Sequence, residues 1–192
     1  MQSPSALPRR LKQLLYFAVA VTACVFPEAH DLHAQAPKPT EYEVEAAYLS
    51  NFGRFVEWPA RGGAATEPFN VCVLDADPFG PLLDAALKGE TIGGAPMAAK
   101  RISKPEDAAA CRIVFIGSVK DSQLNGILQS LRASNALTVS DMPGFSRRGG
   151  MIQFVLDGNR VRFEINLAAV QRAGLTVSSE LLKVAQAVRR AP

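Results

Sequence analysis

Apolar residues follow two spacings along this chain, one typical of buried strands and one typical of amphipathic helices. Short, mostly apolar segments at residues 69–74, 111–116 and 136–140, the first with a continuous apolar run at 71–74, predict buried strands. Between these runs, apolar residues recur three and four positions apart, which predicts helices with one buried face. The helical sets are Val44, Tyr48, Phe52 and Phe55, then Phe79, Leu82, Leu83 and Ala86, then Leu124, Ile127, Leu128 and Leu131.

Polar residues mark where the predicted helices begin. Thr40 and Glu43 have the spacing of a capping box, in which a hydroxyl side chain and a carboxylate satisfy free backbone N–H groups at a helix start. Asp77 stands before a proline and Asp121 stands before a helical pattern, so both aspartates are predicted to be N-caps. The pair Gly93-Gly94 predicts a turn that leads into a further strand near residues 98–102.

The last quarter of the chain predicts a hairpin followed by two helices. Residues 151–156 and 160–165 alternate as strands do, and an Asp-Gly-Asn turn joins them. One helix is expected over residues 166–172, and a second is expected after Ser178. The apolar side of that second helix is predicted to carry Leu181, Val184, Ala185 and Val188.

Strands that alternate with helices favour an α/β fold with a largely parallel sheet. We expect a three-layer domain in which a parallel-rich sheet carries the C-terminal hairpin at one edge and helices on both faces. Residues 37–192 are expected to form this single domain.

Residues 1–36 have the pattern of a secretory signal. A cationic stretch ending at Lys12 precedes an apolar run at 14–26, and Ala34-Gln35-Ala36 follows as a cleavage motif. The apolar run is shorter than the roughly 20 residues that cross a bilayer, which disfavours a retained membrane helix. A second processing route stays open, because residues 21–24 resemble a lipobox in which Cys24 would carry a lipid.

Composition and charge exclude several classes of function. The 192 residues carry a net charge of only +3, and the sequence after the leader has no Lys/Arg cluster interleaved with aromatic residues, so a nucleic-acid partner is not expected. His30 and His33 both lie in the leader, which removes histidine triads and imidazole metal sites from the mature chain. No nucleotide motif is present, and no cofactor is expected.

Two cysteines, Cys72 and Cys111, remain after the leader. An even number of cysteines in an exported chain predicts one disulfide. Two separate buried thiols on apolar strands are the alternative.

Three aspartates follow predicted strands, where ligands bind in open α/β sheets. Asp75, Asp77 and Asp141 could converge on a metal, as in a metal-dependent hydrolase. An N-cap role for Asp77 is a sufficient structural explanation and favours a chain without catalytic or metal-binding residues.

A glycine-rich loop and the final hairpin form the other candidate site. Alternation places Arg160, Arg162 and Glu164 on one face of the last strand, with Arg162 close enough to offset the charge of Glu164. Gly149-Gly150 stands beside an arginine pair and is interpreted either as an anion cradle or as a bend with positive φ. The candidate partner surface, centred on Glu164, comprises Arg147, Arg148, Met151, Phe154, Arg160, Arg162 and Glu164; plain solvent exposure is the alternative.

Three strings of this sequence resemble the YfiR-like periplasmic proteins. They are AAYLSNFGRFVEWP at 46–59, VCVLDADPFG at 71–80 and LTVSDMPGFSRRGGMIQFVLDGNRVRFEINLA at 137–168. The resemblance implies a dimeric, non-enzymatic periplasmic α/β protein that represses a membrane-bound diguanylate cyclase by contacting its periplasmic region. It also implies a disulfide between Cys72 and Cys111. Some members have a second cysteine pair near the glycine-rich loop, and this sequence has none there.

Overall fold

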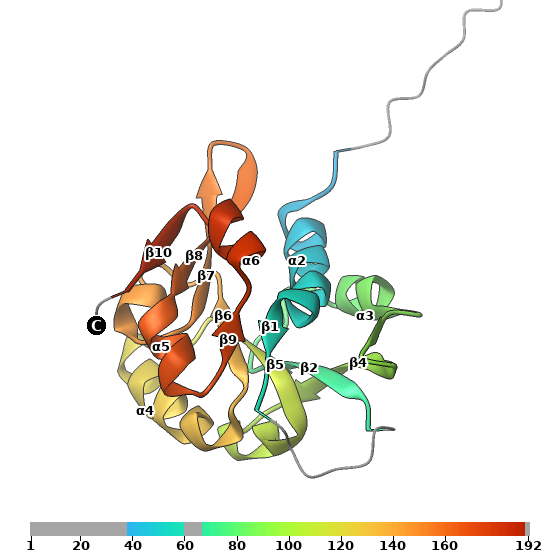
Figure 1. Ribbon diagram of the computed structural model, residues 1–192, viewed down its shortest axis with the longest axis horizontal. Helices are drawn as coiled ribbons and strands as arrows, with labels where there is room; N and C mark the ends of the chain where they lie inside the picture. Colours follow the sequence, from blue (N-terminus) through green and yellow to red (C-terminus); the bar gives the residue numbers. More distant parts are fainter. Residues whose placement is uncertain (1–37, 60–66, 191–192) are drawn as a thin grey trace, which may run out of the picture. The chain divides into compact units, whose positions relative to one another are not determined.

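The computed structural model describes residues 38–59 and 67–190, which belong to the compact unit 38–192 of the chain. The predicted secretory signal and the alternative lipid site at Cys24 lie outside the described residues. In chain order the elements are α2 Glu41–Phe55, β1 Val56–Glu57, β2 Phe69–Leu74, α3 Pro81–Leu87, β3 Thr91–Ile92, β4 Ala95–Ile102, η1 Pro105–Ala110, β5 Cys111–Ile116, α4 Asp121–Leu131, η2 Arg132–Ser134, β6 Leu137–Ser140, η3 Ser146–Arg148, β7 Ile152–Asp157, β8 Arg160–Asn166, α5 Leu167–Arg172, β9 Thr176–Val177, α6 Ser179–Val184 and β10 Ala187–Arg189 (Figure 1).

The main sheet of the described residues has eight strands in the order β10-β8-β7-β6-β5-β2-β4-β3. Neighbouring strands are parallel except in the hairpins β7–β8 and β3–β4. A second, two-stranded sheet pairs β1 with β9, with Val56 opposite Val177. The expected α/β class with a parallel-rich sheet is confirmed.

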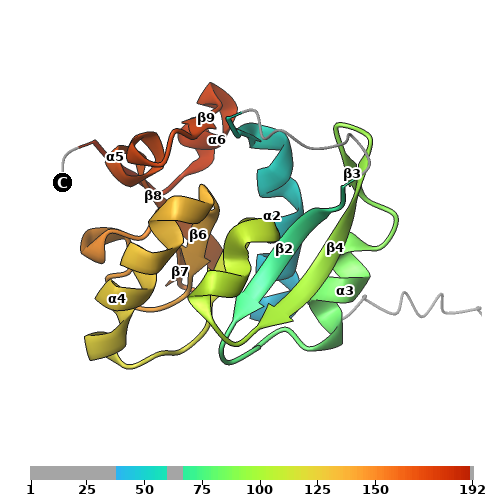
Figure 2. The ribbon, with the colours of Figure 1, turned by 90° about the horizontal axis from the view of Figure 1, so that it is seen from below.

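Both faces of the central strands are covered, which is why their sequences are mostly apolar. In β2, Val71 and Val73 join the cluster built with α2 and α3, whereas Cys72 and Leu74 join the cluster built with α4 and η1. Figure 2 shows α2 and α3 next to β2 and β4. This arrangement confirms the three layers that the alternating elements predicted.

The capping box at the start of α2 is present as predicted. The Glu43 backbone N–H donates to the Thr40 hydroxyl oxygen, and the Thr40 backbone N–H donates to the Glu43 carboxylate. The Glu43 carboxylate accepts from both the backbone N–H and the hydroxyl of Thr40, and these two bonds hold the pKa of Glu43 below its usual value.

The two aspartates predicted to cap helices do not do so. Asp77 accepts hydrogen bonds from the backbone N–H groups of Phe79 and Gly80, at 2.8 and 3.2 Å, and so closes a turn before the helix. Helix α3 begins only at Pro81, because the positive φ of Gly80 (50°) lies outside the helical region. Asp121 is the first residue inside α4, and its carboxylate pairs with Arg148.

The last predicted helix is shorter than expected. It ends at Val184, and Val188 lies in β10, which pairs in parallel with β8. As a strand, residues 187–189 form backbone hydrogen bonds with β8, which would otherwise be the edge of the sheet. The spacing of apolar residues within this segment cannot predict such long-range pairing. The hairpin is therefore next to the edge of the sheet, and β10 forms the edge itself.

Candidate functional site

A buried polar network joins the glycine-rich loop to the final hairpin. Ser146 is fixed through three of its atoms: its N–H donates to Gln153 Oε1 (3.1 Å), its hydroxyl donates to Glu164 Oε2 (2.8 Å), and its carbonyl accepts from Asn166 Nδ2 (2.7 Å). Arg189 Nη2 also donates to Glu164 Oε2, at 3.2 Å. We call these five residues, Ser146, Gln153, Glu164, Asn166 and Arg189, the Glu164 network.

The hairpin register brings this network together. Gln153 in β7 stands directly opposite Glu164 in β8, so their side chains share one face of the sheet. Asn166 ends β8 and caps α5, because its side-chain oxygen accepts from the Ala169 N–H at 3.0 Å. The network thus connects the loop, both strands of the hairpin and the start of α5.

The predicted charge partner of Glu164 was wrong. Arg162 lies two residues along the same strand, whereas the cation that reaches the Glu164 carboxylate is Arg189, in β10. Because β10 pairs with β8 and sets Arg189 opposite Asn166, its long side chain extends back to Glu164. Among the described residues, Arg162 forms no ion pair, and it is half-buried.

Two apolar members of the predicted partner surface are buried. Met151 is 8% exposed and Phe154 is 2% exposed, so neither forms an apolar patch on the surface. Phe154 stands opposite Phe163 in the hairpin, and its ring centroid lies 5.9 Å from that of Phe52. Tyr48 and Phe52, both on α2, belong to the same aromatic cluster. Alternation correctly separated the polar and apolar faces of the hairpin, but helix α2 packs on the apolar face and buries it.

The glycine pair acts as a bend. Gly149 has φ of 101°, in the left-handed region, and ends the short helix η3. At Gly150 a Cβ atom would stand 2.1 Å from the Phe145 ring, so only glycine fits there. Next to the bend, Arg147 is exposed, while Arg148 pairs with Asp121 at 2.6 Å.

The three aspartates of the hydrolase alternative do not assemble a metal site. Asp77 pairs with Arg101 at 2.8 Å, and Asp75 is exposed. Among residues 38–59 and 67–190, no group of three or more Asp, Glu, His or Cys side chains could hold a metal ion. The strand order reverses between β2 and β5, where such folds bind ligands. There the backbone of Gly117 packs directly against the backbone of Ala76, because a Cβ at Gly117 would come within 2.0 Å of the Ala76 carbonyl oxygen.

Sequence reasoning missed a buried acid in α2. Glu45 is 1% exposed, and neither of its carboxyl oxygens has a hydrogen-bond partner among the described residues. Burial, together with the charges of Asp141 and Glu41, raises the pKa of Glu45 to about 8. Burial also raises the pKa of Asp141. Position 45 lies one turn before Leu49 on the buried face, so helical spacing was a signal that could have found it.

The predicted disulfide is confirmed. Cys72 in β2 and Cys111 in β5 are bonded, with Cα atoms 5.9 Å apart. Both are buried in the cluster beneath α4. The bond joins adjacent parallel strands at the centre of the sheet, away from the Glu164 network.

The sequence of this domain matches one protein family along most of its length. The YfiR/HmsC-like family model matches residues 42–186, which include every strand of the sheet except β10. The chain belongs to the YfiR/HmsC-like family. This family consists of periplasmic regulatory proteins and is not catalytic.

Solved structures share the fold of this YfiR/HmsC-like chain at low sequence identity. A conserved domain protein from Vibrio cholerae is 11% identical with a TM-score of 0.54, and the match covers 78% of this chain and 60% of that one. The ABC domain from Streptococcus pneumonia, solved in complex with L-Trp, is 12% identical with a TM-score of 0.44, over 62% of this chain and 55% of that one. This YfiR/HmsC-like chain therefore spans less than two thirds of either neighbour, and the first likeness supports the fold alone. Among the described residues, no helix has the length and apolar character needed to span a membrane.

Proposed function

We propose that this chain is an exported, non-enzymatic regulator that binds the periplasmic region of a membrane-bound diguanylate cyclase and lowers its output of cyclic-di-GMP. The observation that carries the proposal is the family match over residues 42–186. We also propose that the protein acts as a homodimer, that its residues 1–36 are a cleaved signal, and that soluble export is favoured over a lipid on Cys24.

The proposed contact surface is the polar face of β8 with the adjoining loop. Arg147 and Arg160 are exposed, while Arg148, Arg162 and Glu164 are half-buried. Met151 and Phe154 lie beneath this surface and support it from the core. Charged groups grouped on a rigid strand suit recognition of a partner with complementary charge.

Glu164 has the central role in this proposal. Its side chain is 21% exposed, and one of its two partners, Arg189, is itself partly exposed at the edge strand. A cation of the partner protein can therefore compete with Arg189 for the Glu164 carboxylate without breaking the bond from Ser146. Burial of that pair at an interface would make Glu164 a residue of high binding energy.

The binding test is calorimetric titration of the mature protein with the periplasmic segment of its cognate membrane cyclase. Glu164→Ala is expected to weaken binding by about 2 kcal/mol, roughly thirtyfold, which is typical of a desolvated charge pair. Glu164→Gln keeps an acceptor for Ser146 and removes only the charge, so it separates the loss of charge from the loss of loop structure.

Glu106→Gln supplies the matched control, because Glu106 is an exposed acid in η1. It should leave the affinity unchanged, and circular dichroism should show the same fold for all variants. Equal affinity for the wild type and both Glu164 variants would remove Glu164 from the interface, and no binding of the wild type would refute the cyclase partner.

Export, processing and oligomeric state have their own tests. Intact mass of protein recovered from the periplasm should correspond to cleavage after Ala36. A mass matching a lipidated chain that starts at Cys24 would establish the rival route. Light scattering should report twice the monomer mass, and a monomer at micromolar concentration would contradict the proposed homodimer.

A further inference from the structure

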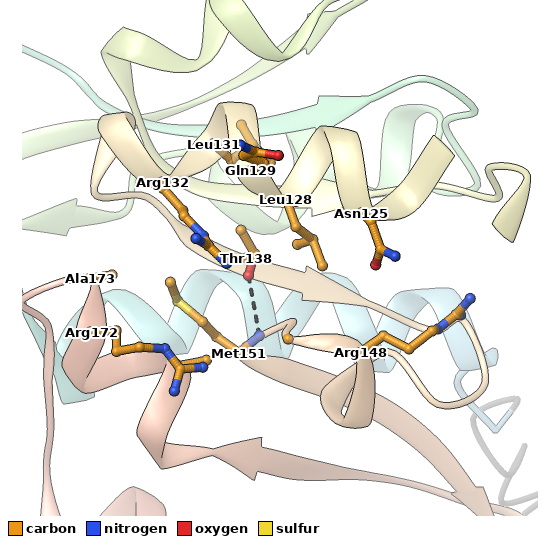
Figure 3. A pocket seen from close by; sticks show the side chains of 12 residues that line it. Asn125, Leu128, Gln129, Leu131, Arg132, Thr138, Arg148, Met151, Arg172 and Ala173 are labelled. Carbon is orange, nitrogen blue, oxygen red and sulfur yellow. Dashed lines mark hydrogen bonds between the residues drawn. The ribbon is translucent and has the colours of Figure 1, made fainter. Parts of the chain in front are cut away.

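A pocket of about 550 Å³ opens between α4 and α5, on the face of the sheet that also carries Glu164 (Figure 3). Four parts of the chain line it: α4 with η2, strand β6, the glycine-rich loop with Met151, and α5. Its volume lies within the range of pockets that bind small molecules, which runs from about 300 to 1,000 Å³.

The charged side chains that line this pocket are all arginines. They are Arg132, Arg148 and Arg172, and the lining contains no aspartate or glutamate. Figure 3 shows Arg132 and Arg172 on opposite sides of the pocket, with Thr138 and Met151 between them. Among the described residues, neither Arg132 nor Arg172 forms an ion pair, so both guanidinium groups can bind an anion.

Arg148 is the third arginine that lines the pocket. Its two terminal nitrogens donate to Asp121 and to the Pro143 carbonyl, at 2.6 and 3.0 Å. Its Nε atom is buried and has no acceptor among the described residues. This nitrogen is a further cationic donor, at the end of the pocket opposite Arg132 and Arg172 (Figure 3).

The floor of the pocket is largely apolar. Leu128, Leu131, Met151 and Ala169 line it, beside the Thr138 hydroxyl. Thr138 Oγ1 accepts the Met151 N–H at 3.2 Å, which leaves its own hydroxyl hydrogen available to a ligand. An inorganic anion would satisfy the arginines but leave the apolar floor uncovered.

We propose that this pocket binds a small organic anion, a carboxylate or sulfonate carried on an apolar body. The acidic group lies between Arg132 and Arg172, where guanidinium groups form charge-assisted hydrogen bonds. The apolar body covers Leu128 and Met151. The pocket shares Arg148 and Met151 with the proposed contact surface, but its test uses the isolated protein, so the result does not depend on the cyclase partner.

Fluorescence titration with 8-anilinonaphthalene-1-sulfonate tests the proposal, since this probe combines a sulfonate with aromatic rings. One saturable site is expected in the wild-type protein, with displacement of the probe by decanoate and not by the same concentration of inorganic phosphate. The double substitution Arg132→Gln and Arg172→Gln should weaken binding at least about tenfold, because it removes two charged hydrogen-bond donors.

Arg54→Gln is the matched control: it removes an exposed arginine on α2, far along the chain from the pocket lining, and should change the affinity less than about twofold. Should the double variant lose its melting transition, Ala173→Phe decides the question, because it fills the pocket while keeping every charge. The methyl resonance of Met151 should shift on binding in the wild type. Absence of saturable binding, equal displacement by phosphate, unchanged affinity in the folded double variant or in Ala173→Phe, or an unshifted Met151 methyl would each overturn the proposal.

Discussion

Glu164 is an acid within strand β8 and Glu45 is an acid in helix α2, and among the described residues the structure provides hydrogen-bond partners only for Glu164. Glu164 accepts from the Ser146 hydroxyl and from Arg189. Glu45 is fully buried in α2, with both carboxyl oxygens unpartnered among the described residues. The first acid holds a loop in place, whereas the second destabilises the helix that carries it.

The difference arises from what lies opposite each side chain. Glu164 faces a loop and an edge strand whose polar atoms need partners of their own, so every bond satisfies two groups. Glu45 faces Asp141, another carboxyl group with a raised pKa, and nearby Glu41 adds like charge. Burial without a counter-charge favours the neutral form of a carboxyl group. We therefore expect substitutions in the Glu164 network to lower the free energy of unfolding and an apolar substitution of Glu45 to raise it.

The largest effect is expected for Asn166→Ala in the Glu164 network. This change removes the cap of α5 and leaves the buried Ser146 carbonyl without its donor, which together should cost about 3 kcal/mol in the free energy of unfolding. Urea denaturation measures the loss. Asn51→Ala, at an exposed site in α2, is the matched control and should change stability by less than about 0.5 kcal/mol. A loss for Asn166→Ala as small as that of the control would mean that the network contributes little.

The opposite sign is expected for Glu45→Met. Methionine is close to glutamate in shape and forms helices well, so the change removes an unpaired carboxyl group with little effect on packing. Unfolding measured at pH 8 should show a gain of about 2 kcal/mol. Glu45→Gln keeps a buried polar group and should gain less. Destabilisation by Glu45→Met would show that the carboxyl group has a partner after all.

The pH dependence of stability sharpens the same contrast. The pKa of Glu45 rises from 4.5 to about 8 on folding, so the folded state keeps a proton that the unfolded state releases. Stability should therefore fall as pH increases from about 4.5 to 8, by up to about 1.4 kcal/mol per pH unit, and level off above that range.

Melting temperatures of the wild type and of Glu45→Gln across this pH range isolate the contribution of Glu45. Asp141 keeps its own raised pKa in both proteins, and Tyr42 titrates above the range, so neither accounts for the difference. A constant gap between the two proteins from pH 4.5 to 8 would show that Glu45 ionises normally in the folded state.

The smallest effects concern the two partners of Glu164. Ser146→Ala removes a partly buried hydrogen bond and should cost about 1 kcal/mol. Arg189→Gln should cost less than about 0.5 kcal/mol at physiological salt, because the arginine side chain is 37% exposed and solvent screens the pair. A double-mutant cycle of Ser146→Ala with Glu164→Ala would measure the coupling energy between the two side chains. Zero coupling would show that Glu164 does not stabilise the loop through Ser146.

Much of the fold follows from local sequence signals. The mostly apolar segments predicted β2, β5 and β6, because both faces of these strands are covered. Thr40 and Glu43 predicted the start of α2, since a capping box involves only neighbouring residues. The even number of cysteines in a chain with an export signal predicted the bond between Cys72 and Cys111. Each of these signals acts over a few residues or follows from composition.

The candidate site depended far more on tertiary structure. Alternation placed Glu164 on the polar face of its strand, but the pairing of β10 with β8 decided that Arg189, and not Arg162, would be its cation. The docking of α2 decided that Phe154 would be buried. The opposition of α2 and the end of β6 set Glu45 near Asp141. Short-range spacing determines which face a side chain takes, whereas its partner comes from an element distant in sequence, and only strand order and helix docking bring the two together.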